Sequence, residues 1–187
     1  MTGKKVKVDF LLFAMLCVTA MTDENGMTLL GLAAALLHEC AHLTAMKLCS
    51  VKVKGIRIRC CGMEINADDN GASLMKRIIC ASAGVAANMI LTLVFFRFKR
   101  FAAANLAMGM ISTLPIKPLD GAAVLKAVTE NLWGADRSEI LCTVCSFVFL
   151  VPMAAGALML TMRSKYNCSL LALCICSLAS VFGDMLI

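Results

Sequence analysis

The two histidines of the chain, His38 and His42, lie four residues apart, with Glu39 directly after the first. Residues four apart share one face of a helix, so both imidazoles can reach a single metal ion. In this His-Glu-x-x-His order the carboxylate lies beside the metal, where it can act as a general base. The spacing therefore predicts a metal site with hydrolytic chemistry. The alternative is a packed histidine pair beside a buried, salt-bridged glutamate.

A catalytic zinc site needs a third protein ligand and one open position. No third histidine exists, so that ligand must be Asp, Glu or Cys. Asp120 is the preferred candidate because Pro115 and Pro118 break the helix before it, and irregular backbone at membrane depth is tolerated where it lines a cavity. The alternatives are Asp184, near the end of the chain, and Cys40, which points to another face of the helix. The alternative role for Asp120 is to cap the helix that follows.

The composition indicates the elements that must position these groups. Hydrophobic residues make up 60% of the 187 residues and charged residues only 16%, whereas a soluble domain is roughly half apolar. We therefore expect an all-α polytopic membrane protein. The net charge of +6 predicts no nucleic-acid partner, because the basic residues flank apolar runs as they do in cytoplasmic loops.

Hydropathy predicts about six membrane-spanning helices, and the motif lies inside the second. The fourth begins near Phe101 and is interrupted at Pro115. The other five are expected at Phe10–Met21, Met27–Leu48, Ile78–Phe96, Ile140–Met162 and Cys168–Ile187.

Two further segments differ from the spans. Val51–Arg59 alternates polar and apolar residues with period two, which predicts a short strand or hairpin at the membrane surface after the second span. Asn66–Gly71 is expected to be its turn or loop. Gly121–Trp133 is amphipathic and is predicted to lie at the membrane interface.

The positions of the lysines and arginines predict how the chain is oriented in the membrane. With a cytoplasmic N-terminus, thirteen of the 18 basic residues fall on inner segments and five on outer loops. Since positive charge is enriched in cytoplasmic loops, both termini are expected in the cytoplasm.

Three segments resemble the site-2 protease family of intramembrane zinc metalloproteases, especially the branch of stage IV sporulation protein FB. They are His38–His42, the glycine-then-asparagine segment Gly84–Asn88 and the proline-rich segment Leu114–Gly121. The chain departs from the family at Ser112, where the family usually has asparagine, and at Ala122, where it often has a second glycine. We expect one membrane-embedded domain over residues 1–187, with a three-helix catalytic core at about 27–124 and no PDZ or CBS domain.

The resemblance implies Zn²⁺ held by His38, His42 and Asp120, with Glu39 as the catalytic base. It also implies that four residues contact the substrate, namely Asn88, Ser112, Pro115 and Pro118. For Asn88 and Gly84 the alternative is ordinary helix packing.

The predicted function is zinc-dependent cleavage of a membrane-associated or membrane-spanning protein. A sporulation sigma-factor precursor is the substrate implied by the resemblance. The expected partners are this tethered substrate, the lipid bilayer and regulatory membrane proteins. The alternatives are an inactive membrane adaptor, which would be expected to have lost Glu39 or a ligand, and a metal transporter, which needs ionisable residues spread over several spans.

Overall fold

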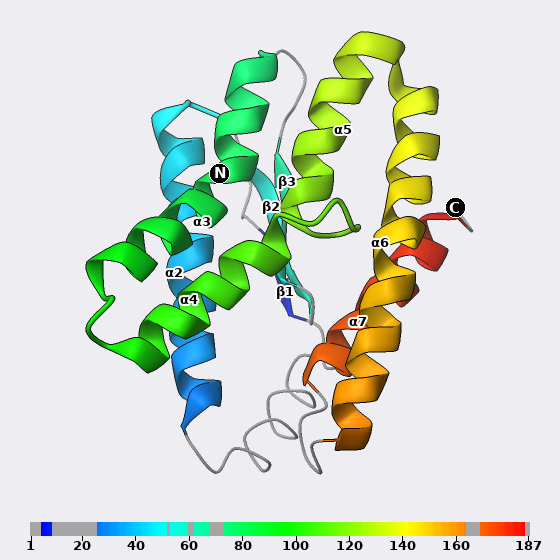
Figure 1. Cartoon of the computed structure of the whole chain (residues 1–187). Helices are drawn as coiled ribbons and strands as arrows, with labels where there is room; N and C mark the ends of the chain where they lie inside the picture. The colour runs from blue at the N-terminus through cyan, green and yellow to red at the C-terminus, as the bar shows by residue number, and fades with distance from the viewer. Residues whose placement is uncertain are drawn as a thin grey trace.

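The computed structural model describes residues 5–8, 26–51, 53–59, 62–67, 73–163 and 169–185. Helices dominate these residues, as expected from the composition, and a small sheet accompanies them (Figure 1). The helices are α2 (Met27–Leu48), α3 (Leu74–Val94), α4 (Lys99–Ser112), α5 (Asp120–Trp133), α6 (Ala135–Arg163) and α7 (Ser169–Met185). The strands are β1 (Lys5–Val8), β2 (Val53–Arg59) and β3 (Gly62–Ala67).

The sheet has the order β1-β2-β3, so β2 is its central strand. β2 pairs parallel with β1 and antiparallel with β3. β2 occupies most of the segment 51–59, for which alternation predicts a strand. A loop was expected at 66–71, but residues 66 and 67 belong to β3. Residues 68–71 lie outside the described residues.

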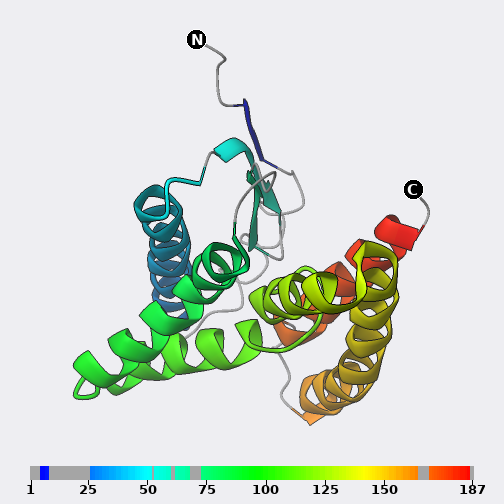
Figure 2. The ribbon, with the colours of Figure 1, turned by 90° about the horizontal axis from the view of Figure 1, so that it is seen from above.

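The helices pack in two neighbouring groups. α2, α3 and α4 contact one another, α6 contacts α7, and α5 contacts both α3 and α6. Seen from above, α5 lies between the two groups (Figure 2). The predicted three-helix core corresponds to α2, α3 and α4, and α5 carries the acidic residue that must reach it.

The expectation of six membrane spans needs correction. Within the described residues three helices, α2, α3 and α6, are long and apolar enough to cross a membrane, which indicates a membrane protein. α4 has 14 residues and is therefore only about 21 Å long, short of the roughly 30 Å hydrocarbon core. α7 has 17 residues and also falls short. The expected first span, Phe10–Met21, lies outside the described residues.

Two local sequence signals divide the second half of the chain. Pro115 and Pro118 cannot donate the hydrogen bonds of a continuing helix, so α4 ends at Ser112 and α5 begins at Asp120. Gly134 follows α5 with φ of 84°, a value that favours glycine, and α6 begins at the next residue. α6 continues through Pro152, where a kink is the sequence-based expectation.

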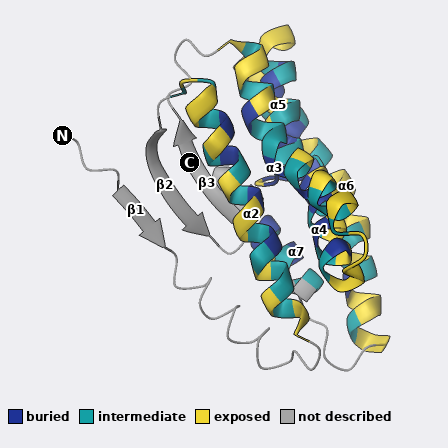
Figure 3. Cartoon of the chain, turned by 90° about the vertical axis from the view of Figure 1, so that its left-hand side faces the viewer, coloured by how far each residue is buried: buried dark blue, intermediate teal, exposed yellow. Residues whose placement is uncertain are grey.

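Burial follows the pattern of a membrane protein. α2 turns one stripe inward, made of Ala34, His38, His42 and Ala45, whereas Leu29, Leu36 and Leu48 are exposed. Figure 3 shows this division of buried and exposed residues along the helices. Apolar side chains that face outward are suited to lipid contact, while the two histidines of α2 face other helices.

Candidate metal centre

The inward stripe of α2 carries both imidazoles. His38 is 3% exposed and His42 is 6% exposed, and their ring centroids lie 4.8 Å apart. Their Nε2 atoms are 3.1 Å from each other. The spacing of four residues therefore brings two nitrogen donors to one point inside the helix group, as the sequence predicts.

Asp120, the first residue of α5, reaches the same point. Its Oδ2 lies 2.8 Å from His38 Nε2, and its Oδ1 lies 3.3 Å from His42 Nε2. One ligand atom from each of the three residues lies within 4.8 Å of the others. Two imidazole nitrogens and one carboxylate oxygen form a donor set that suits catalytic zinc, with a fourth position left for water or substrate.

The backbone of α3 forms a wall of this site at Gly84. A Cβ added at Gly84 would fall 2.4 Å from His42 Nε2 and 2.5 Å from His38 Nε2. No side chain larger than hydrogen fits there while the rings keep their places. Glycine at this position therefore lets the two Nε2 atoms converge.

The other ring nitrogens are also held by α3. His42 Nδ1–H donates to the Cys80 carbonyl oxygen over 2.7 Å. Asn88 Nδ2 lies 3.1 Å from His38 Nδ1. Such second contacts fix the orientation of metal-binding imidazoles.

The remaining residues predicted for the site lie around these groups. Glu39 is half-buried in the same turn of α2 as His38. Ser112 is buried at the end of α4, Pro115 is half-buried and Pro118 is exposed in the segment that leads to Asp120. Their catalytic and substrate-binding roles stay predictions.

One rival third ligand, Cys40, is not part of this group. Cys40 is exposed on α2, so it points away from the imidazoles. Asp184 lies in the last turns of α7, and its side chain is outside the described residues. Among the described residues, the group of potential metal ligands is His38, His42 and Asp120.

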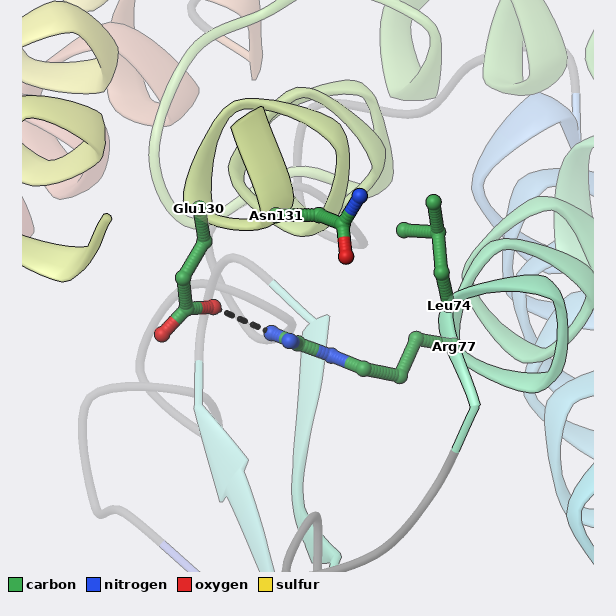
Figure 4. A pocket seen from close by; sticks show the side chains of 4 residues that line it. All are labelled: Leu74, Arg77, Glu130 and Asn131. Carbon is green, nitrogen blue, oxygen red and sulfur yellow. Dashed lines mark hydrogen bonds and ion pairs between the residues drawn. The ribbon is translucent and has the colours of Figure 1, made fainter. Parts of the chain in front are cut away.

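Two sets of contacts hold α5 and the segment before it. Arg77 of α3 donates to Glu130 of α5 over 2.6 Å, beside a cavity of about 250 Å³ lined also by Leu74 and Asn131 (Figure 4). This ion pair joins the two helices that carry Gly84 and Asp120.

The second set starts from Lys117, which is 8% exposed. Its backbone N–H donates to Ser146 Oγ over 3.0 Å, and its Nζ donates to Glu139 and to Thr143 Oγ1 on α6. Lys126 of α5 also donates to Glu139, over 2.9 Å. The hydrogen bond to Glu139 raises the pKa of Lys126 above its ordinary value. Sequence reasoning missed this network, and the lysine between the two prolines was its signal.

The architecture matches that of a solved structure, the site-2 protease from Methanocaldococcus jannaschii. The TM-score is 0.71, and the match covers 98% of this chain and 92% of that chain at 16% sequence identity. The chain has a fold similar to that of a site-2 protease. No protein-family model matches the sequence, and no curated protein matches it. At 16% identity the likeness to the site-2 protease concerns the fold, and the chemistry rests on the residues of the site.

Proposed function

We propose that this protein is an intramembrane zinc endopeptidase that cleaves a membrane-associated or membrane-spanning protein. The observation that carries the proposal is the convergence of His38, His42 and Asp120 inside a group of apolar helices. Polar groups at membrane depth are costly and are usually functional. The likeness in fold to a site-2 protease supports the same activity.

Each residue has a distinct part in the proposed reaction. His38, His42 and Asp120 would hold Zn²⁺, which would supply a stronger water nucleophile and polarise the scissile carbonyl. Glu39 accepts a proton from the attacking water as the C–O bond forms. The same carboxyl group then donates that proton to the leaving nitrogen as the C–N bond breaks.

The finer assignments extend this proposal. The three segments that resemble the sporulation branch favour a sigma-factor precursor, tethered to the membrane, as the first substrate to test. Ser112, Pro115 and Pro118 are the proposed substrate contacts, and regulatory membrane proteins are the proposed partners. The resemblance to the sporulation branch favours a bacterial cytoplasmic membrane, and the distribution of basic residues favours both termini in the cytoplasm.

The decisive experiment compares the wild type with Glu39→Gln, co-expressed with membrane-tethered candidate substrates. The amide keeps the size of the side chain but cannot accept the proton, so we expect cleavage to fall at least 10²-fold or so. Zinc content, measured by elemental analysis of the purified proteins, should be unchanged because Glu39 is not a ligand.

Four further outcomes complete this test. A chelator should stop cleavage by the purified wild type, and added zinc should restore it. Normal cleavage by Glu39→Gln would overturn the mechanism. Zinc binding without cleavage of any tethered substrate would favour an adaptor, and zinc flux into vesicles would favour a transporter.

A further inference from the structure

One face of α3 lies against both imidazoles. Cys80, Gly84 and Asn88 are spaced by four residues, so they lie one above another on the helix, and all three are buried. Gly84 faces the two Nε2 atoms, Cys80 contacts His42 and Asn88 contacts His38. This face has the same spacing as the two histidines that it contacts.

Each imidazole needs a hydrogen-bond acceptor at its outer nitrogen if its inner nitrogen binds the metal. When Nε2 of a neutral imidazole is a ligand, Nδ1 carries the ring N–H. For His42 the acceptor is the Cys80 carbonyl oxygen, 2.7 Å from Nδ1. For His38 the group at Nδ1 is the carboxamide of Asn88.

The carboxamide of Asn88 can supply that acceptor. Its side chain is fully buried, which excludes bulk water as a partner for His38 Nδ1. Nδ2 lies 3.1 Å from the ring nitrogen, while Oδ1 is buried without a hydrogen-bond partner among the described residues. A half-turn of the amide exchanges the two atoms, because a carboxamide is nearly symmetric in shape. Oδ1 then accepts from His38 Nδ1–H, so these two atoms satisfy each other, and Nδ2 takes the place that Oδ1 held.

We propose that Asn88 is a positioning residue that accepts a hydrogen bond from His38 Nδ1–H and so directs His38 Nε2 toward the metal. This inference rests on the proposed zinc site, and it assigns Asn88 to the histidine instead of to the substrate. Loss of such a partner typically lowers metal affinity by about 10–100-fold.

The test measures zinc affinity, by competition with a chromogenic chelator, in purified full-length protein. Asn88→Leu keeps the approximate volume but removes the acceptor, so we expect zinc to bind about 10–100-fold more weakly. Asn88→Asp retains an acceptor oxygen at the same place, and its affinity should stay within a few-fold of the wild type.

Asn105→Leu is the matched control. Asn105 is also a fully buried asparagine, on the neighbouring helix α4, and its Oδ1 likewise has no hydrogen-bond partner among the described residues. Its Nδ2 donates to the Phe101 carbonyl oxygen and not to a histidine. Asn105→Leu should therefore leave zinc affinity unchanged, even if it alters stability.

A spectroscopic readout separates positioning from general damage. Cobalt in place of zinc gives visible bands that report ligand geometry, and these should change in Asn88→Leu but not in Asn88→Asp or Asn105→Leu. Equal zinc affinity in wild type and Asn88→Leu would overturn the inference, as would equal losses in Asn88→Leu and Asn88→Asp. If the wild type binds zinc tightly but cleaves nothing, the proposed protease activity is wrong, while the proposed hydrogen bond between Asn88 and His38 is unaffected.

Discussion

At the scale of single residues, the metal centre depends on a missing side chain as much as on its ligands. A Cβ at Gly84 would come within 2.6 Å of three ring atoms of His38 and His42. These atoms end side chains that can swing away, so the fold can survive the added methyl group. The two Nε2 atoms would then no longer converge.

Gly84→Ala should therefore lower zinc affinity more than tenfold while the fold persists. In the interior of a helix, alanine is favoured over glycine by about 1 kcal/mol, which offsets part of the crowding. Zinc content and thermal unfolding of the purified variant check both expectations. Gly31→Ala on α2 is the control, because nothing lies within 4 Å of its added Cβ. Normal zinc content in Gly84→Ala would contradict the close approach.

The ligands could be read from the sequence, but some of their supports could not. Zinc sites use histidine and aspartate side chains, so two histidines four residues apart and an aspartate after two prolines can be recognised in the sequence. The Cys80 contact uses a backbone carbonyl oxygen, which every residue type possesses, so no sequence pattern indicates it. Asn88 was predicted to contact substrate, and the structure places it against His38.

At the scale of elements, α6 holds the segment that delivers Asp120. Lys117 lies in that segment, and its backbone and side chain both contact α6. Ile116 and Leu119, on either side of Lys117 and Pro118, are buried in the same apolar cluster as Leu150 of α6. The position of the third ligand is thus set by a helix outside the predicted core of residues 27–124.

Lys117→Met should lower both the free energy of unfolding and the retention of zinc. Removing one partner of a buried ion pair costs about 3–5 kcal/mol. Because the Glu139 side chain is 43% exposed, solvent stabilises it after the loss, and we expect roughly 1–3 kcal/mol. Unfolding in detergent, followed by circular dichroism with and without zinc, measures both effects.

Lys126→Met tests whether the effect is specific to the contacts of Lys117 with α6. Lys126 donates to the same carboxylate, but its side chain is 46% exposed. Its loss should cost under about 1 kcal/mol and leave zinc in place. If the two variants behave alike, the contacts of Lys117 with α6 do not position Asp120.

At the scale of the whole molecule, the sequence predicted a helical membrane protein but overestimated its spans. Hydropathy detects apolar runs, and it does not show where a run will be cut. α4 has only 14 residues because the interruption predicted at Pro115 and the short loop before Lys99 bound it. Hydropathy also does not predict the contacts of α5 with both helix groups, because these depend on the direction that the chain takes after α4 ends.

The outward face of α6 provides a test of membrane crossing. Val148, near the middle of this 29-residue helix, is 62% exposed although it is apolar. If α6 spans the bilayer, this side chain faces lipid, and Val148→Lys should oppose insertion by about 2.5–3.5 kcal/mol. We expect less of this variant in the membrane fraction and more degradation than for the wild type. Leu132→Lys is the control, since Leu132 is equally exposed at 63% but lies near the end of α5, outside the spans. Equal membrane levels of both variants would mean that the middle of α6 does not face lipid, and the metal centre would then lie at a different depth from the one proposed.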